Sequence, residues 1–315
     1  MQLFQMPSVV STVASVLIPC SLCMLFWYFR QRKVKVDVRG KVVLITGASS
    51  GLGKACAVIF YKAGAKVILA ARNLDALEKV KQELLALDVP NKKLFDPDII
   101  QLDLADFDSI AKAAQAALGC HGNVHILINN AGMSYRGEIL ETSLEVQKKL
   151  MAVNYFGHVA LTKALLPSMI EQREGHIVAV SSIQGKLSIP FRSAYSASKH
   201  AMQAFFDCLR AEAAQHNIQV CIVSPGYIKT NISLNAMTGD GSSYGVMDES
   251  TKTGMLPEDV AAGILSAVRT KQVDILQAPF AHRIAVYVRN LLPGVMASVM
   301  EKRARKQRKL MEKQK

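Results

Sequence analysis

Two ionisable side chains stand four residues apart near the middle of the chain, in the stretch YSASKHA at residues 195–201. On a helix, residues i and i+4 share one face, so Tyr195 and Lys199 would be neighbours. A nearby cation stabilises phenolate and lowers the pKa of a tyrosine, which makes the phenol a usable general acid or base near neutral pH. Tyrosine and lysine are common residues, so this spacing alone identifies no reaction.

Alternating strand and helix patterns surround the pair from Gly40 onward. The strand-like runs are apolar on both faces, and helical stretches with amphipathic periodicity separate them. Such a pattern predicts a parallel sheet with helices on both sides, here as a single α/β domain over residues 40–280. The predicted strands lie at residues 41–47, 66–72, 98–104, 124–130, 175–182 and 218–226.

A glycine-rich stretch, LITGASSGLGKA, joins the first predicted strand to the first predicted helix. Glycines at this place let the backbone turn tightly and approach a pyrophosphate, which the amides of the helix N-terminus then bind. The alternative interpretation is a plain turn with a helix cap, and the strand–loop–helix context favours the cofactor loop. The loop residues expected to contact a dinucleotide are Gly47, Ser49, Ser50, Gly51, Leu52 and Gly53.

The end of the second predicted strand reads AARN and carries no acidic residue. An acid there would accept hydrogen bonds from a free ribose 2′-hydroxyl and would repel a 2′-phosphate. The chain has Arg72 instead, whose guanidinium is shaped to bind phosphate. The sequence therefore favours NADP(H) over NAD(H), with an ordinary surface arginine as the alternative.

Six motifs in order along the chain resemble the classical short-chain dehydrogenases/reductases. The resemblance covers roughly residues 40–273. It implies a doubly wound parallel sheet of the Rossmann type, usually with seven strands. The motifs are TGxxxGLG at 46–53, NNAG at 129–132, VNYFG with Asn154, Ser182 thirteen residues before Tyr195, YxxxK at 195–199, and SPGYIKT at 224–230.

The resemblance also implies roles for four matching side chains. Ser182 would donate to the carbonyl oxygen of the substrate, and Tyr195 would give that oxygen its proton. Lys199 would lower the pKa of the tyrosine and hold the nicotinamide ribose. Asn154 would fix a water molecule that joins Lys199 to solvent. All four are therefore catalytic candidates, and two of them, Ser182 and Tyr195, are also expected to bind the substrate.

Further cofactor contacts follow from the same resemblance. Asp103 matches the adenine contact, and Asn130 and Gly132 match the floor of the cofactor site. Thr230 matches the contact to the nicotinamide amide. Considered alone, several of these residues have structural alternatives; Asp103, for example, could cap the next helix.

Together these residues predict hydride transfer between NADP(H) and a carbonyl or alcohol carbon. The alternative from another class is a non-enzymatic nucleotide sensor or scaffold tethered to a membrane. An irregular stretch at residues 227–255 predicts a lid over a hydrophobic, lipid-like substrate such as a steroid, a retinoid or a glycerolipid precursor. Homodimerisation is usual in the family. The apolar lid residues expected to contact the substrate are Ile232, Leu234, Met237, Tyr244 and Met247.

The N-terminal region, residues 1–39, reads as a membrane anchor with a basic flank. Residues 1–29 contain no charged side chain and are long enough to span a bilayer once, and RQRKVK follows directly. Because lysine and arginine favour the cytoplasmic side, we expect a cytosolic domain, and the anchor suits the endoplasmic reticulum membrane. The sequon Asn231-Ile232-Ser233 leaves a lumenal domain as the alternative.

The net charge of +13 is concentrated at the two ends of the chain. Residues 30–41 carry +5 and residues 301–315 carry +6, which leaves +2 for the rest. A nucleic-acid-binding domain would carry such charge on a folded face, so we expect none here. We expect the apolar and then basic extension at residues 281–315 to lie on the membrane surface. The histidines and cysteines have no metal-ligand spacing, so we expect no metal.

Overall fold

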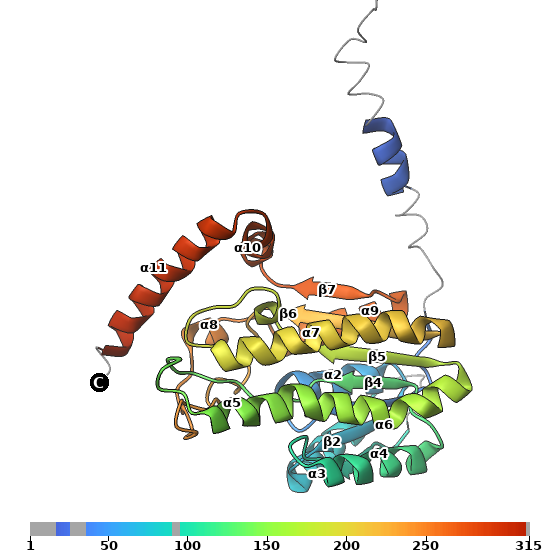
Figure 1. Ribbon diagram of the computed structural model, residues 1–315. Coiled ribbons are helices and arrows are strands. Elements are labelled where there is room, and N and C mark those ends of the chain that lie inside the picture. The colour runs from blue at the N-terminus through green and yellow to red at the C-terminus, as the bar shows by residue number, and fades with distance from the viewer. Residues whose placement is uncertain (1–16, 26–35, 90–94, 313–315) are drawn as a thin grey trace, which may run out of the picture.

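One parallel sheet organises the part of the chain that the computed structural model describes, which is residues 17–25, 36–89 and 95–312. Within these ranges the sheet has seven strands in the order β3-β2-β1-β4-β5-β6-β7 (Figure 1). This order confirms the single-domain, doubly wound Rossmann architecture. The strands are β1 (Val42–Thr46), β2 (Lys66–Ala71), β3 (Asp98–Gln101), β4 (Ile126–Asn129), β5 (Gly175–Val180), β6 (Ile218–Pro225) and β7 (Asp274–Gln277).

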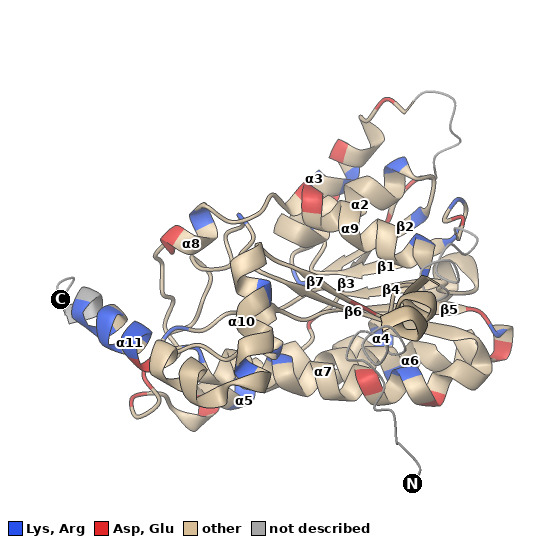
Figure 2. Ribbon diagram, turned by 90° about the horizontal axis from the view of Figure 1, so that it is seen from above, with Lys and Arg blue, Asp and Glu red and all other residues tan. Residues whose placement is uncertain are grey.

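The central strands are buried on both faces, as their continuous apolar sequences predict. Every residue of β1, β4 and β5 is buried, and β1 pairs in register with β2 on one side and β4 on the other. Helices α2 (Gly51–Lys62), α3 (Leu74–Leu85) and α9 (Pro257–Thr270) cover one face of the sheet. Helices α4 (Phe107–His121), α6 (Gly157–Gln172) and α7 (Ser193–Ala213) cover the other face (Figure 2).

The strand order reverses between β1 and β4, and this reversal positions the site. From β1 the chain moves outward through β2 to β3, and from β4 it moves the other way. The loops after β1 and β4 therefore diverge and open a crevice at the carboxyl ends of the strands, where ligands bind in open α/β sheets. Helix α5 (Leu144–Met151) and a π-helical turn at Ala152–Phe156 lead from that edge into α6.

The stretch after β6, residues 226–256, is irregular apart from the short helix α8 (Glu249–Lys252), as its composition predicts. An isolated bridge between Met237 and Tyr135 ties it to the rest of the domain, and a bridge between Ile228 and Met255 joins its two ends. We call residues 226–256 the lid segment.

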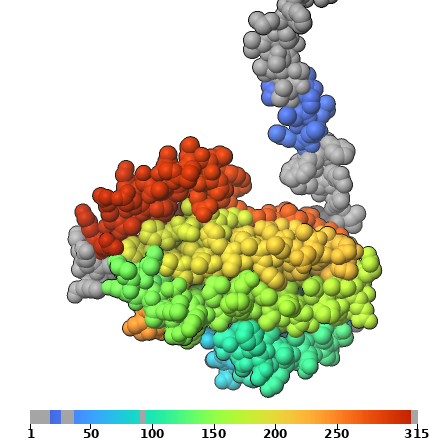
Figure 3. Space-filling view, viewed as in Figure 1, coloured from blue at the N-terminus to red at the C-terminus, as the bar shows by residue number. Residues whose placement is uncertain are grey.

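The C-terminal extension forms two helices, α10 (Phe280–Leu291) and α11 (Pro293–Glu312). They stand as a ridge above the domain body (Figure 3). On the inner side, Val286 and Met296 pack with Leu187 in a small buried cluster. On the outer side, large apolar residues remain more than half exposed: Phe280, Tyr287, Leu291, Leu292 and Val295.

A short helix covers residues 17–25, and its apolar side chains are exposed. The anchor predicted from residues 1–39 lies largely outside the described residues. Among the helices of the described ranges, none combines the length and the apolar character that crossing a membrane requires.

Candidate active site

Helix α7 places Tyr195 and Lys199 on one face, as their spacing predicts. The ammonium nitrogen of Lys199 lies 6.0 Å from the centroid of the Tyr195 ring. Both residues are buried, with 8% and 3% of their surfaces exposed. Lys199 Nζ donates to the carbonyl oxygen of Val180, at 2.9 Å, at the end of strand β5. The pair therefore lies at the carboxyl edge of the sheet, where the crevice opens.

The pKa of Tyr195 differs from the sequence-based expectation. Burial raises the pKa of the phenol, because ionisation would place a negative charge in a dry environment, and a hydrogen bond from Ser182 acts in the opposite direction. Burial also lowers the pKa of Lys199 to about 8. The lysine was expected to lower the pKa of the tyrosine, and no lowering by Lys199 is seen in this geometry. The cation points to the Val180 carbonyl oxygen, and desolvation outweighs the other influences on the phenol.

Ser182 follows strand β5 by two residues and begins a 3₁₀ turn at Ile183–Gly185. Its hydroxyl oxygen accepts a hydrogen bond from the backbone N–H of Gln184, at 3.1 Å. The Ser182 hydroxyl lies near the Tyr195 phenol and acts to lower its pKa. The bond from Gln184 therefore helps to hold the hydroxyl beside the phenol.

Asn154 is completely buried inside the π-helical turn that joins α5 to α6. Such turns occur frequently at functional sites. The Asn154 amide forms hydrogen bonds with both backbone groups of Met133, at 2.7 and 2.9 Å, and with the Ser198 hydroxyl at 3.0 Å. A Cβ added at Gly132 would lie 3.3 Å from Asn154 Oδ1 and 3.6 Å from Lys199 Nζ. The two polar side chains therefore converge on the backbone of Gly132.

The glycine-rich loop has the geometry of a phosphate cradle. Gly47 has a φ of +68°, a left-handed conformation that favours glycine. At Gly53, a Cβ would overlap the Gly47 carbonyl oxygen and lie 2.6 Å from Asn130 Nδ2. The N-cap residue of α2, Ser50, makes no side-chain capping bond, so the first amides of that helix face the crevice without a cap. These features fit a bound pyrophosphate.

Thr46 ties the glycine loop to the floor of the crevice, although the sequence analysis assigned it no role. It is fully buried, and its hydroxyl accepts from the backbone N–H groups of Asn130 and Ala131, at 2.9 and 3.0 Å. The Asn130 side chain in turn donates to the Thr46 carbonyl oxygen at 2.8 Å. The position of Thr46 within the TGxxxGLG motif was the available signal.

Three other predicted cofactor residues lie on the rim of the crevice. Arg72 is exposed directly after β2. Asp103 accepts from the backbone N–H of Ala105 at 2.9 Å, while Asp106 is the residue that caps α4. Thr230, in the lid segment, packs against the glycine loop, since a Cβ at Gly51 would lie 3.1 Å from its methyl group.

A cavity of about 850 Å³ runs along the carboxyl edge of the sheet and brings these residues together. Asn154 does not line it and lies behind Gly132. Every other predicted catalytic or cofactor-binding residue is part of its wall: Gly47, Ser49, Ser50, Gly51, Leu52, Gly53, Arg72, Asp103, Asn130, Gly132, Ser182, Tyr195, Lys199 and Thr230.

The end of the cavity between Tyr195 and the lid segment, which we call the substrate half, is more polar than the sequence analysis predicts. Of the five apolar lid residues expected there, only Ile232 lines the cavity. Met237 instead packs into a buried cluster with Tyr135 and Tyr195. Side chains that can form hydrogen bonds make up much of this end: Ser134, Arg136, Gln184, Tyr227, Asn231, Asn235 and Ser243.

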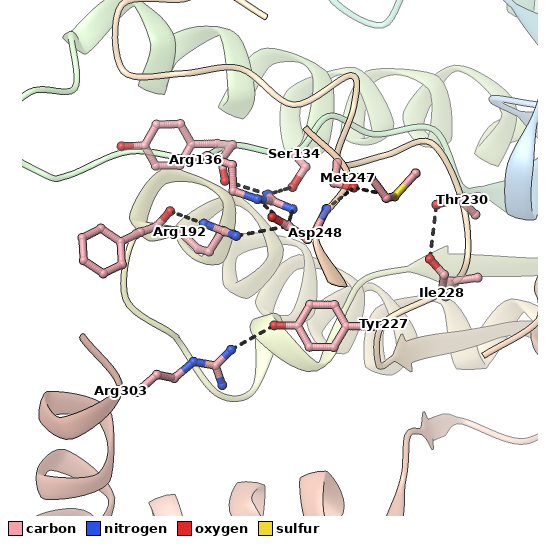
Figure 4. Close-up of polar contacts among 12 residues, drawn as sticks. Ser134, Arg136, Arg192, Tyr227, Ile228, Thr230, Met247, Asp248 and Arg303 are labelled. Atoms are coloured by element: carbon pink, nitrogen blue, oxygen red, sulfur yellow. Dashed lines mark hydrogen bonds and ion pairs between the residues drawn. The ribbon is translucent and has the colours of Figure 1, made fainter. Parts of the chain in front are cut away.

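Two features of the site escaped the sequence analysis. His158 is fully buried one turn after Asn154, where it contacts the Ala131 carbonyl oxygen at 2.7 Å and Asn129 Oδ1 at 3.1 Å. Burial and the nearby Lys199 charge lower the pKa of His158 to about 3, so the ring is neutral. Arg136 is also buried, in the wall beside the lid segment (Figure 4). A lone histidine and a lone arginine carry no spacing signal, so only the structure reveals them.

Both the sequence and the fold of this chain are similar to those of known proteins of one family. The family model described as "short chain dehydrogenase" matches residues 41–240. Dehydrogenase/reductase SDR family member 7B of Bos taurus is 54% identical over 300 residues, covering 95% of this chain and 92% of that protein. Dehydrogenase/reductase SDR family protein 7-like of Drosophila melanogaster is 51% identical over 289 residues, covering 92% and 88%.

Solved structures with the same fold include complexes with both nicotinamide dinucleotides. A short-chain dehydrogenase/reductase from Burkholderia phymatum in complex with NAD has a TM-score of 0.71 and 27% identity, over 81% of this chain and 94% of that one. A metagenomic short-chain oxidoreductase in complex with NADP has a TM-score of 0.63 and 28% identity, over 78% and 99%. This chain belongs to the short-chain dehydrogenases/reductases, oxidoreductases whose fold binds nicotinamide dinucleotides.

Proposed function

We propose that the protein is a membrane-bound, NADP(H)-dependent oxidoreductase that interconverts a carbonyl and an alcohol on a hydrophobic, lipid-like substrate. The observation that carries this proposal is the convergence of Ser182, Tyr195 and Lys199 on one cavity wall, with Asn154 directly behind it. A sensor or scaffold needs a nucleotide site, but it has no chemical reason to bury a phenol, a hydroxyl and an ammonium group together.

The cofactor half of the cavity would hold the dinucleotide through the glycine loop and the N-terminus of α2. Asn130 and Gly132 would form the floor beneath it, and Thr230 would close it from the lid segment. The bound cofactor supplies the hydride. Arg72 supports the choice of NADP(H), because its exposed guanidinium lines the cavity where a 2′-phosphate would lie.

Proton transfer would belong to Tyr195 and Ser182. In reduction, the Ser182 hydroxyl donates to the substrate carbonyl oxygen and stabilises the charge that develops there. The phenol of Tyr195 then gives this oxygen a proton. Its raised pKa keeps the phenol protonated at neutral pH, which is the form that reduction requires. Oxidation would need the phenolate, so it should be favoured at alkaline pH.

Lys199 and Asn154 would support this proton transfer. With its pKa lowered to about 8, the ammonium group of Lys199 can lose and regain a proton more readily than an exposed lysine. Asn154 Oδ1 and Lys199 Nζ approach the same glycine, so the amide would help to fix a water molecule that joins the lysine to solvent.

The shape of the substrate half suits an amphipathic molecule. Polar side chains line the cavity near Tyr195, so the reacting end of the substrate would be polar. Tyr227, on the cavity wall, accepts a hydrogen bond from Arg303 of α11, at 3.2 Å. An apolar chain leaving the cavity on this side would meet the exposed apolar residues of α10 and α11. We propose that this ridge lies on the membrane surface, with the anchor in the endoplasmic reticulum membrane and the domain in the cytosol.

The test is reduction of lipid-like ketones by the full chain in detergent, with Tyr195→Phe as the matched variant. A steroid, a retinoid and a glycerolipid-precursor carbonyl would be offered with NADPH, and loss of NADPH absorbance would be followed. We expect at least one to be reduced and Tyr195→Phe to lower kcat by about 10²–10⁴-fold. NADPH binding, measured by fluorescence, should be unchanged in the variant.

Two results would contradict the proposal. Binding of NADPH without reduction of any carbonyl would favour the nucleotide sensor or scaffold. A Tyr195→Phe protein that keeps the wild-type rate would remove the tyrosine from the mechanism.

A further inference from the structure

A buried cluster of three charges joins three separate segments around the substrate half of the cavity. Asp248 belongs to the lid segment, Arg136 follows strand β4, and Arg192 is the N-cap residue of α7. Asp248 Oδ2 accepts from Arg136 Nε at 2.8 Å, from Arg136 Nη2, and from Arg192 Nη2 at 3.2 Å (Figure 4). One carboxylate oxygen therefore holds two guanidinium groups.

The three side chains of the cluster are largely shielded from solvent. The side chains of Asp248, Arg136 and Arg192 are 15%, 8% and 7% exposed. Charge-assisted hydrogen bonds of this kind are strong and directional, and removal of one partner leaves an uncompensated buried charge. Without Asp248, two guanidinium groups of like charge would face each other in a dry site. The carboxylate is therefore the counter-ion that the two arginines share.

Each arginine is connected to a group at the reacting end of the cavity. Arg136 Nη1 donates to the Ser134 hydroxyl at 2.6 Å and to the Tyr135 carbonyl oxygen at 2.8 Å, and its side chain lines the cavity. The positive charge of Arg136 also acts on the phenol of Tyr195. Arg192 stands three residues before Tyr195, at the start of the same helix.

The lid segment has a second attachment, and it is made by the backbone alone. Arg136 N–H donates to the Met237 carbonyl oxygen at 2.8 Å, and Met237 N–H donates to the Ser134 carbonyl oxygen at 3.0 Å. That attachment holds the first half of the segment. Asp248 lies eleven residues later, directly before α8, and its side chain attaches the second half.

We propose that Asp248 is a positioning residue of the reaction, which fastens the second half of the lid segment over the substrate and fixes Arg136 in the cavity wall beside Tyr195. The inference rests on the proposed function for its catalytic part, whereas the fastening of the lid segment is independent of turnover. Asp248 does not line the cavity and would act through the two arginines.

The first experiment measures hydrogen exchange in the full chain, with and without NADPH, for the wild type, Asp248→Asn and Glu249→Gln. Glu249 is the next residue in the same segment and is exposed, so it is the matched control. We expect Asp248→Asn to accelerate exchange at residues 238–256 by at least tenfold, and the strands β1, β4 and β5 to exchange as in the wild type. Unchanged exchange at residues 238–256, or equal acceleration in the central strands, would overturn the proposal.

The second experiment separates positioning from general destabilisation. With a carbonyl that the wild type reduces, we expect Asp248→Asn to raise KM by about tenfold, with a smaller change in kcat and an unchanged Kd for NADPH. Asp248→Glu should recover part of the loss. Asp248→Asn combined with Arg192→Gln restores the net charge of the cluster and should lower KM relative to Asp248→Asn alone.

If KM and the Kd for NADPH rise together, or if Asp248→Glu recovers nothing, Asp248 is a structural residue only. If no carbonyl is reduced by the wild type, the proposed function fails, and the exchange experiment still decides whether Asp248 fastens the lid segment.

Discussion

The two halves of the cavity are built in different ways. The cofactor half consists of small residues and backbone groups that belong to short motifs, such as Gly47 and Gly53; even Thr46 and Asn130, which are 84 residues apart, both lie in such motifs. The substrate half is held by side chains that belong to no motif and are far apart in sequence. Arg136 and Asp248 are separated by 112 residues, and Arg192 and Asp248 by 56.

This difference separates what a fold family keeps constant from what a single protein can vary. Backbone amides bind a phosphate in the same way whatever the neighbouring side chains are, so the cofactor half depends on conformation. The substrate half depends on which charges meet and how dry they are, and one substitution can change both. Four predictions test this contrast, beginning with the largest expected effect.

Gly53→Ala should abolish nucleotide binding. Its Cβ would overlap the Gly47 carbonyl oxygen, a backbone atom that cannot move without displacing the loop. We expect the Kd for NADPH, measured by fluorescence, to rise by more than about 100-fold, which corresponds to about 3 kcal/mol. The matched control is Gly119→Ala, because Gly119 also lies in a helix and has open space around it.

The control should bind NADPH normally and gain roughly 0.5–1 kcal/mol of stability, since alanine favours helices. Normal NADPH binding by Gly53→Ala would show that the cofactor half tolerates changes in its backbone, and the contrast would be lost.

Arg72→Ala should weaken the binding of NADPH and leave that of NADH nearly unchanged. Charge-assisted hydrogen bonds contribute about 1.5–3 kcal/mol each, so we expect a rise of roughly 10–100-fold in the Kd for NADPH. Competitive titration of the two cofactors on wild type and variant measures the ratio. Equal weakening for both cofactors would mean that Arg72 contacts a part of the molecule that they share.

Acid should destabilise the protein through the buried neutral histidine beneath the cofactor floor. The folded-state pKa of His158 is about 3, below the value of roughly 6.5 for an unfolded chain, so the unfolded state takes up the proton first. The unfolding free energy should therefore fall as pH decreases from about 6.5 toward 3, by up to about 1.4 kcal/mol per pH unit. Urea unfolding at several pH values measures the slope.

His158→Gln should flatten this slope, whereas His216→Gln, at a partly exposed position in the 3₁₀ turn after α7, should leave it unchanged. His176, with a pKa of about 4 because of burial, contributes in the same direction in both variants. An identical slope in wild type and His158→Gln would show that His158 is not the group that titrates.

The smallest effect is expected on the outer surface of the substrate half, where α11 carries its basic residues (Figure 2). For a chain that begins at Val36, Lys306→Gln should weaken binding to vesicles of anionic lipid by about fivefold, since one basic residue near such a surface contributes about 1 kcal/mol. Lys163→Gln, at an exposed position of helix α6, removes the same charge elsewhere and should have no effect. If Lys306→Gln and Lys163→Gln weaken vesicle binding equally, the protein is attracted by its overall charge and α11 does not dock on the membrane.

The amino-acid sequence by itself determined the sheet, the glycine loop, and the shared helix face of Tyr195 and Lys199, whereas Ser182 and Asn154 were identified through the family resemblance. These features depend on local rules: apolar runs that form buried strands, glycines that permit tight turns, and an i, i+4 spacing on a helix. Each rule concerns residues that are close in sequence, so a short motif is sufficient to predict the structural feature.

Only the tertiary structure decided the electrostatics and the substrate wall. The pKa of Tyr195 is raised because of burial, and burial is a property of the packed molecule. The cavity wall on the substrate side was expected to be apolar, but it is largely polar. Met237 packs in a buried cluster away from the cavity, and Asp248 holds Arg136 at the cavity wall. Contacts across more than a hundred residues leave no periodic signal, so the chain must fold before these charges have partners.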